Sequence, residues 1–473
     1  MQIRKGKAKV LILKNREMAK YHLSPVDVPK VSTKYRKIKT KLPVPESLSI
    51  FQTLSESEPV SMMGQPPIVW DKAEGLQIYD KWGNKWIDWS SGVLIANAGH
   101  GRKEIIKALR NLLDRKLLAT YVFVHEKRAE LTKMLQGLSP DPTNYLVFLL
   151  STGSEAIENC IKLAKTYALE KHGPQKKYLV SFNNAFHGRT LGAQLAGGMA
   201  KLKTWIIDEG KTFIQVPFPD GYKNENISFD LFLDSLKEKG INPGDIAGII
   251  TESYQGVGPD FFPVEYARKL EAFCLENDIV SIFDEVQSGF GRTGKMFAYE
   301  HYGIKPDLIA CGKGISSSLP ISAVIGRKDI MSLFAPGSMT STHSGSPLPV
   351  VAAVESLKII KKENLVENAK ELGEVLIPEL ARIRNKYPDV LGCMQGKGLV
   401  AGIQVVKKGT KVPDSETALK INEKCFHKGL LMFAPVGIAG ECLKIAPPLI
   451  TTEEALREGI KVFEEACDEI LGK

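Results

Sequence analysis

A lysine between two glycines is the first residue that could do chemistry: Lys313, in the run Cys311-Gly312-Lys313-Gly314. The run follows a short apolar stretch, so Lys313 is expected at the end of a strand, where its glycine neighbours leave the ammonium group open to approach. In a desolvated pocket the pKa of such a lysine falls and its amine becomes a nucleophile. Most lysines are solvated, so Lys313 taken alone also fits a surface loop.

An acidic residue follows another apolar run: Asp284, in Phe283-Asp284-Glu285-Val286-Gln287. Ligands in open α/β sheets bind beyond the carboxyl ends of the strands. A carboxylate at such a position could bind a metal ion, act as a base or pair with a cation. The simpler interpretation is a side chain that caps the following helix.

Two polar runs could bind a phosphate group. The run from Ser151 to Glu155 separates an apolar stretch from an amphipathic one, so Gly153 and Ser154 are expected at a helix N-terminus. Such a terminus offers unpaired N–H groups and the positive end of the helix dipole. A capping box without a ligand is the alternative. The second run, 337–347, is rich in Ser, Thr, Gly and Pro, and it fits a plain surface loop equally well.

The elements that must position these residues form a regular alternation between about residues 100 and 345. Short apolar runs predict strands at 145–150, 177–182, 245–252, 278–286, 308–311 and 323–325. Longer stretches between them, such as the one after Ser154, have apolar residues at helical spacing. Apolar strands separated by helices are typical of a parallel sheet covered on both faces, so the predicted class is α/β.

The two flanks of this region have a different pattern. Residues 68–89 predict a meander of strands with Gly83-Asn84 as a two-residue turn, whereas long helices dominate after residue 345. We therefore expect two domains, a large one with the sheet and a smaller α+β one that both flanks build. We expect four parts. Residues 1–45 form a basic arm that need not be ordered, and residues 46–100 contribute to the small domain. Residues 101–345 form the large domain, and residues 346–473 form the C-terminal small domain.

One long stretch adds a family resemblance to these signals. The segment FDEVQSGFGRTGKMFAYEHYGIKPDLIACGKGIS, residues 283–316, resembles the signature of the class III (subgroup II) aminotransferases, which depend on pyridoxal 5′-phosphate (PLP). The likeness runs from about Trp70 to the C-terminus. It implies PLP fold type I and a relationship to 4-aminobutyrate, ornithine and acetylornithine aminotransferases. The same family includes an aminomutase and some amino-acid racemases.

The resemblance also implies roles for individual residues. Lys313 would form the Schiff base with PLP and move the substrate proton, and Asp284 would pair with the pyridine nitrogen. Gln287 would bind the phenolic oxygen of the ring. The other cofactor-binding positions that it implies are Gly153 and Ser154 at the phosphate, Phe186 on the ring face with His187 beside it, and Glu252 in support. Thr342 would reach the phosphate in a neighbouring subunit, which implies a homodimer with shared active sites.

Two positions depart from the family pattern. Many members have an arginine before the late Pro-Pro pair that binds the substrate carboxylate, and Lys444 stands there in this chain. A lysine can meet a carboxylate as a point charge but not as a bidentate fork. Members also often have an acid two residues after Gln255, where this chain has Val257. The substrate-binding positions are therefore altered, whereas the cofactor-binding positions match.

These features predict an aminotransferase that moves an amino group from an amine or amino acid, ω-amino acids included, to a 2-oxo acid. The alternative is a racemase or epimerase of amino acids on the same fold, which needs only loss and return of a proton. Val257 weakens this alternative because it cannot act as the second acid.

Charge and cysteine content bear on partners and location. The net charge of +9 divides into +11 in residues 1–45 and −2 in the rest, so the basicity does not predict nucleic-acid binding by the body of the protein. The seven cysteines form no C-x-x-C pair and have no metal-site spacing. With no apolar run long enough for a membrane span, we expect a cytoplasmic protein with no metal.

Overall fold

The computed structural model describes residues 21–207 and 210–472. Its centre is a seven-stranded sheet in the order β6-β14-β13-β12-β9-β7-β8. All neighbours are parallel except β14, which runs antiparallel to both β13 and β6. The strands span Tyr145–Leu150 (β6), Tyr178–Phe182 (β7), Phe213–Val216 (β8), Ile246–Glu252 (β9), Val280–Glu285 (β12), Leu308–Cys311 (β13) and Ser322–Arg327 (β14).

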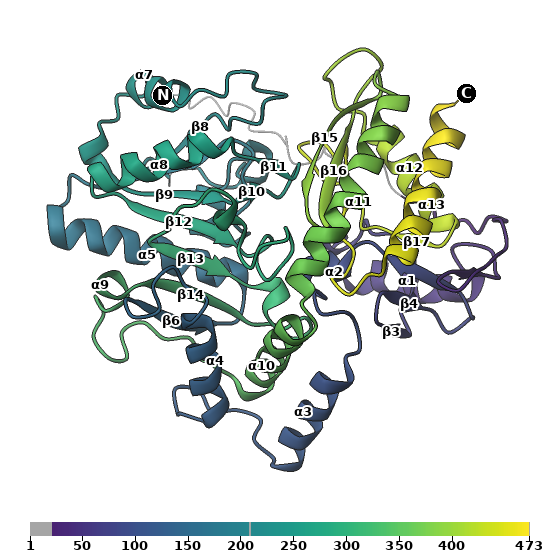
Figure 1. Cartoon of the computed structure of the whole chain (residues 1–473), viewed down its shortest axis with the longest axis horizontal. Coiled ribbons are helices and arrows are strands. Elements are labelled where there is room, and N and C mark those ends of the chain that lie inside the picture. The colour runs from purple at the N-terminus through teal and green to yellow at the C-terminus, as the bar shows by residue number, and fades with distance from the viewer. Residues whose placement is uncertain (1–20, 208–209, 473) are drawn as a thin grey trace, which may run out of the picture.

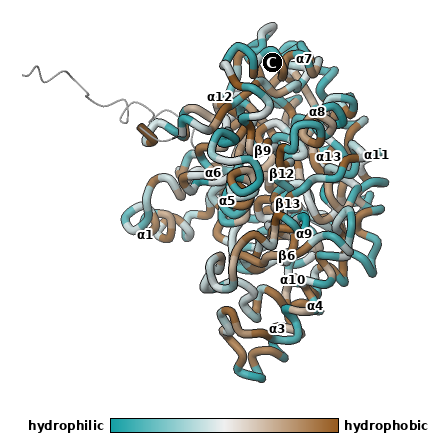
Figure 2. Tube along the Cα trace, turned by 90° about the vertical axis from the view of Figure 1, so that its left-hand side faces the viewer, coloured by the Kyte–Doolittle hydropathy of each residue, from teal (hydrophilic) through white to brown (hydrophobic). Residues whose placement is uncertain are grey.

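Helices cover both faces of this sheet. Along β13, Leu308 and Ala310 pack with α5 (Gly153–His172), whereas Ile309 and Cys311 belong to the core that includes α8 (Val264–Glu276). This alternation follows from the two-residue period of a strand. The strands carry hydrophobic colours in Figure 2, and Figure 1 shows them as one twisted layer between helices. The predicted α/β class with a mostly parallel sheet is therefore confirmed.

The smaller part of the molecule contains segments from both chain ends. A three-stranded antiparallel sheet, β15-β16-β18, spans Leu391–Lys397, Val400–Val405 and Cys442–Ile445. A second sheet joins β17 (Leu430–Leu431) in parallel to β5 (Lys85–Asp88) of the N-terminal segment. Figure 1 shows the purple N-terminal and yellow C-terminal segments on the same side. The domain boundaries at residues 100 and 345 stay a prediction.

Long helices pack on these smaller sheets, as the sequence pattern predicts. They are α11 (Leu365–Lys386), α12 (Ser415–His427) and α13 (Glu453–Leu471). Helix α10 (Pro347–Lys362) instead packs against α3 (Lys103–Asp114) and α4 (Glu126–Gln136), at the lower edge of Figure 1. Among the described residues, no helix combines the length and apolar character needed to cross a membrane.

The meander of the N-terminal segment is present, but its turn differs from the prediction. Strand β3 spans Lys72–Glu74 and β4 spans Gln77–Tyr79, and Tyr79 pairs with Lys85 of β5. The β4–β5 loop therefore has five residues, not the two predicted. Its buried Asp80 accepts hydrogen bonds from the backbone N–H groups of Trp82 and Asn84, which stabilises the longer loop.

The predicted basic arm is ordered over residues 21–45. Strands β1 (Val31–Ser32) and β2 (Lys37–Ile38) pair with each other, and β2 pairs with β5. Basic side chains of this segment bind helix α13: Lys34 pairs with Glu454, and Arg36 pairs with Glu458 at 2.6 Å. These contacts explain the order, because the basic charges meet acidic partners on the body. Residues 1–20 of the arm lie outside the described residues.

Candidate active site

A cavity of about 320 Å³ opens at the carboxyl ends of β6, β9, β12 and β13. This volume is in the range of small-molecule sites. Eight of the predicted site residues line it, namely Gly153, Ser154, Phe186, His187, Glu252, Asp284, Gln287 and Lys313. They meet because parallel strands end at the same edge of the sheet, and each strand delivers one or two of them there.

The N-terminus of α5 faces this cavity and is capped as well. Thr152 accepts a hydrogen bond from the N–H of Glu155 at 3.2 Å, and Glu155 accepts one from the N–H of Thr152 at 3.0 Å. This capping box does not use the N–H groups of Gly153 and Ser154. They have no intrahelical acceptor, so they can bind a ligand. The capping interpretation and the phosphate-binding interpretation are therefore compatible. A Cβ at Gly153 would lie 2.7 Å from Cγ1 of Val286, so close packing also requires this glycine.

Asp284 is fixed by two hydrogen bonds at the end of β12. Its Oδ2 accepts from Nδ1 of His187 at 2.8 Å, and its Oδ1 accepts from the N–H of Val286 at 3.0 Å. Nε2 of His187 is buried and has no partner among the described residues. A carboxylate held in this way can bind a protonated ring nitrogen without rotating. The His187–Asp284 pair was not predicted from the sequence, although both residues were.

Glu252 is a second buried carboxylate, one strand away. Its oxygens accept hydrogen bonds from the N–H of Phe186 at 2.9 Å and from the N–H of Gly256 at 2.8 Å. Burial raises the pKa of Glu252 to about 7, against the lowering effect of His187 and of the two backbone donors. The residue therefore ties the Phe186 segment to the turn after β9.

Lys313 follows β13 directly and has a backbone φ of +38°, which is unusual for a residue with a side chain. A Cβ at its neighbour Gly314 would clash with the side chain of Asn97, so close packing requires this glycine. Burial lowers the pKa of Lys313, and the nearby carboxylates of Asp284 and Glu252 oppose that effect. A lowered pKa increases the fraction of neutral amine, the form that attacks a carbonyl carbon.

Lys444 approaches the site from the smaller sheet but lies behind the cavity wall. Its Nζ donates to Oε1 of Gln287 and to the backbone oxygen of Gly256. The residue is 2% exposed, and burial lowers its pKa to about 8. Gln287 lines the cavity, whereas Lys444 does not. The sequence therefore predicted that Lys444 lies near the site, but only the structure shows its contact with Gln287.

Thr342 does not line the cavity of its own chain. It is exposed in the loop before α10, where Ser341 donates to Glu155 at the start of α5 at 3.2 Å. The cavity is also lined by Ser318, Leu319, Pro320 and Ile321, which the sequence pattern did not single out. They are apolar or small residues in loops, and no sequence signal distinguishes them from ordinary loop residues.

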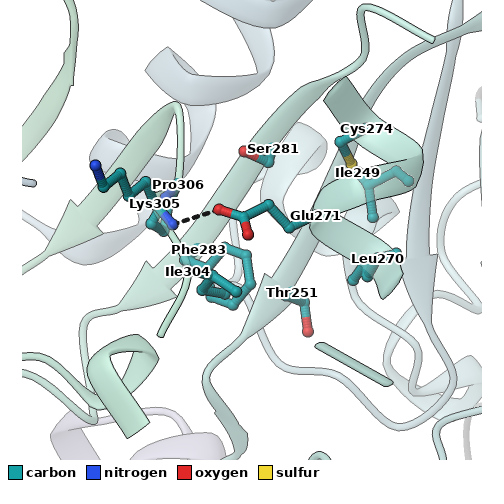
Figure 3. Close-up of a pocket in the computed structure, with 10 residues that line it drawn as sticks. All are labelled: Ile249, Thr251, Leu270, Glu271, Cys274, Ser281, Phe283, Ile304, Lys305 and Pro306. Carbon is teal, nitrogen blue, oxygen red and sulfur yellow. Dashed lines mark hydrogen bonds between the residues drawn. The ribbon is translucent and has the colours of Figure 1, made fainter. Parts of the chain in front are cut away.

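A second, small cavity lies between α8 and the strands β9 and β12 (Figure 3). It has a volume of about 10 Å³, at most enough for one water molecule, and mainly apolar walls. Of its two charged lining residues, Glu271 already accepts a hydrogen bond from the backbone N–H of the other, Lys305, at 2.6 Å. This cavity is therefore a packing void and not a ligand site.

The lining of the larger cavity fits PLP on three grounds. The buried Asp284 can hold a protonated pyridine nitrogen, the α5 N-terminus can bind a phosphate, and Lys313 supplies an amine of lowered pKa. Nε2 of His187 has no partner among the described residues, so the residues around Asp284 can form a further hydrogen bond.

Comparison with known proteins agrees with this fit. Residues 60–467 match the sequence model of the family described as Aminotransferase class-III. A 4-aminobutyrate aminotransferase of Mycobacterium leprae is 30% identical over 90% of this chain and 97% of its own. An alanine/serine racemase of Pyrococcus horikoshii is 30% identical over 95% of this chain and 96% of its own.

A solved structure extends the likeness to the fold and the cofactor. The ornithine aminotransferase of Toxoplasma gondii, described with partial occupancy of PLP at its active site, superposes with a TM-score of 0.79. It is 25% identical and covers 91% of this chain and 96% of its own. The family match, the relatives and the geometry of the cavity together show that this chain belongs to the class III aminotransferases, with PLP as its cofactor and transamination as its reaction.

Proposed function

We propose that Lys313, Asp284 and the α5 N-terminus form the PLP site of this transaminase, with Lys313 as the covalent attachment point. The observation that carries this assignment is that one cavity joins a lysine of lowered pKa, a carboxylate fixed by His187 and a helix N-terminus. Bound PLP supplies an electron sink for the charge left when the substrate loses a proton. The amine of Lys313, freed when the substrate amine takes its place, would take up that proton and return it to a different carbon.

The remaining predicted residues would hold the cofactor in place. Phe186 would lie against the ring, and Gln287 would bind its phenolic oxygen. Glu252 keeps the Phe186 segment in position through its bond to the backbone N–H. Ser154 adds a hydroxyl to the N–H groups at the phosphate end. All of them line the cavity, which supports this assignment.

Lys444 is proposed as the cationic group that attracts the carboxylate of the substrate. Two of its three N–H donors have partners among the described residues, Gln287 and Gly256. Because Gln287 lies between Lys444 and the cavity, the ammonium would attract a carboxylate by its charge and not as a bidentate partner. In this arrangement the cation, Lys444, is separated from the reactive amine of Lys313. It suits an amino acid whose amine lies far from its carboxylate, such as the 4-aminobutyrate in the name of one relative.

A homodimer is proposed to complete the site. The loop between α3 and α4 exposes Phe123 (75%) and Val124 (88%), an unusual position for large apolar side chains. Tyr121 of this loop contacts Thr340 at 3.4 Å, so the apolar loop adjoins the loop that carries Thr342. A second copy on this face would cover the apolar side chains and bring Thr342 to the partner's phosphate site.

A cytoplasmic location is proposed on different grounds. All seven cysteines are unpaired, and six of them are buried. Unpaired buried cysteines are typical of proteins from reducing compartments.

The experiment that tests the function follows the visible absorbance of the protein mixed with PLP. A panel of α-amino acids, ω-amino acids and simple amines is added singly, and 2-oxoglutarate or pyruvate is then supplied as acceptor. Transamination predicts loss of the cofactor band with the right donor and its return with the acceptor. Failure with the whole panel, together with interconversion of amino-acid enantiomers without any oxo acid, would instead show the racemase alternative.

A further inference from the structure

We propose that Lys444 is a positioning residue for Gln287: it holds the side-chain oxygen of the amide, so that the amide N–H groups are presented to the cavity. This inference rests on the proposed PLP site. It gives Lys444 a task in the resting enzyme, before any substrate carboxylate arrives.

The direction of the Gln287 amide follows from the chemistry of its partner. A lysine ammonium only donates hydrogen bonds, so the atom of Gln287 that faces Nζ of Lys444 must be the oxygen. The NH₂ group of an amide lies on the other side of the carbonyl carbon. Gln287 lines the cavity, and Lys444 lies behind Gln287. The NH₂ group is therefore the part of the amide that can donate a hydrogen bond into the cavity.

The surroundings of Lys444 hold it in this orientation. The ammonium also donates to the backbone oxygen of Gly256, and it lies 5.7 Å from the ring centre of Tyr254. Among the described residues, no carboxylate is within 4.0 Å of it to pull it away from Gln287. With 2% exposure, Lys444 has no access to bulk water as an alternative partner.

Gly256 confines the amide from another side. A Cβ at this position would lie 2.8 Å from Nε2 of Gln287 and 2.8 Å from Oε1 of Glu252. The Gln287 side chain is therefore packed between the Gly256 turn and Lys444. Rotation of the amide by half a turn would place its NH₂ group against the ammonium, where two donors face each other.

The consequence concerns the phenolic oxygen of bound PLP. An N–H group that donates to this oxygen stabilises its deprotonated form and lowers the pH at which the absorbance of the cofactor changes. The readout is therefore an absorbance titration of the holoenzyme without substrate. Lys444→Met should raise the titration midpoint by about one pH unit, the size of shift that a hydrogen bond to a charged group produces.

A double-mutant cycle separates positioning from a simple charge effect. If Lys444 acts through Gln287, Lys444→Met should shift the midpoint in the native background but not in a Gln287→Ala background. An equal shift in both backgrounds, or no shift in either, would overturn the proposal. Lys176→Met is the matched control, because Lys176 is a buried lysine bound to Asn277 at the opposite edge of the sheet, and it should leave the midpoint unchanged.

Lys444→Gln provides a second test that does not depend on how the methionine variant folds. Its amide can donate to Oε1 of Gln287 without a charge. A midpoint near that of the native enzyme supports positioning, and a midpoint raised as much as in Lys444→Met contradicts it. If the native protein shows no cofactor band with PLP, the proposed PLP site itself is wrong. If the band is present but its titration midpoint is the same in the Lys444 variants, only the role of Lys444 is wrong.

Discussion

The two sides of the active site are built in different ways. On the cofactor side, Asp284 and Glu252 lie at the carboxyl ends of two strands of one mostly parallel sheet, and Lys313 follows a third, so the backbone of that sheet sets their spacing. On the substrate side, Lys444 reaches Gln287 from a separate sheet, across 157 positions of the chain. The first arrangement can change little without breaking the sheet. The second depends on how two sheets pack, and this is where the chain departs from the family pattern.

The largest loss of activity is expected on the cofactor side, at Lys313. Lys313→Ala removes both the covalent attachment point and the proton carrier, and a positioned acid–base group alone contributes about 10²–10⁴-fold to a rate. We expect transamination to fall by about 10³-fold or more for every donor, as measured by single-turnover absorbance. Lys176→Ala, the remote buried lysine, should retain activity. A donor-dependent loss would contradict the assignment of Lys313 to the cofactor side.

Asp284→Asn should have the next largest effect, again for all donors. The change keeps the shape of the side chain but removes the negative charge that holds a ring proton, and loss of one preorganised electrostatic group costs about 10²–10³-fold in kcat. A matched control is Asp278→Asn, because Asp278 forms a comparable pair with His172 at 2.6 Å on the opposite edge of the sheet. Equal losses in the two variants would show that Asp284 has only a structural role.

The pH dependence of stability tests the buried carboxylate of the cofactor side. The pKa of Glu252 is raised by burial from 4.5 to about 7, so the folded protein binds its proton more tightly than the unfolded chain. Glu252 alone should therefore lower the stability by about 3 kcal/mol as the pH rises from about 4.5 to about 7, with no further change above that pH. Denaturant unfolding of the cofactor-free protein measures this.

Glu252→Gln should reduce the dependence of stability on pH between about 4.5 and about 7. Asp260, whose pKa burial also raises to about 7, contributes to the native slope, and Asp260→Asn serves as the comparison. A slope in Glu252→Gln that equals the native one would show that Glu252 is not protonated in the folded state.

The smallest effect is expected on the substrate side, and it should depend on the substrate. Lys444→Met should raise KM for a 2-oxo acid by about tenfold, because a positive charge behind the cavity wall is lost. Amine donors without a carboxylate should be affected less, and steady-state kinetics with both donor types measure the difference. Equal changes in kcat for both types, with unchanged KM, would place Lys444 wholly on the cofactor side.

The sequence alone predicted six of the seven strands of the main sheet, all except β8, and the site at its edge. Apolar runs such as 145–150 and 308–311 match β6 and β13 residue for residue, because strands buried on both faces need continuous apolar side chains. Lys313 and Asp284 follow such runs directly. Parallel strands end at one edge, so the position of each residue after its strand was enough to bring the two together.

The tertiary structure decided the contacts between segments that are distant in the sequence. His187 binds Asp284, Lys444 lies behind Gln287, and Thr342 does not line the cavity of its own chain. The order of residues 21–45 likewise depends on acidic partners on α13. Local periodicity describes the faces of single elements, whereas these contacts depend on the packing of separate sheets and helices, which no local pattern encodes.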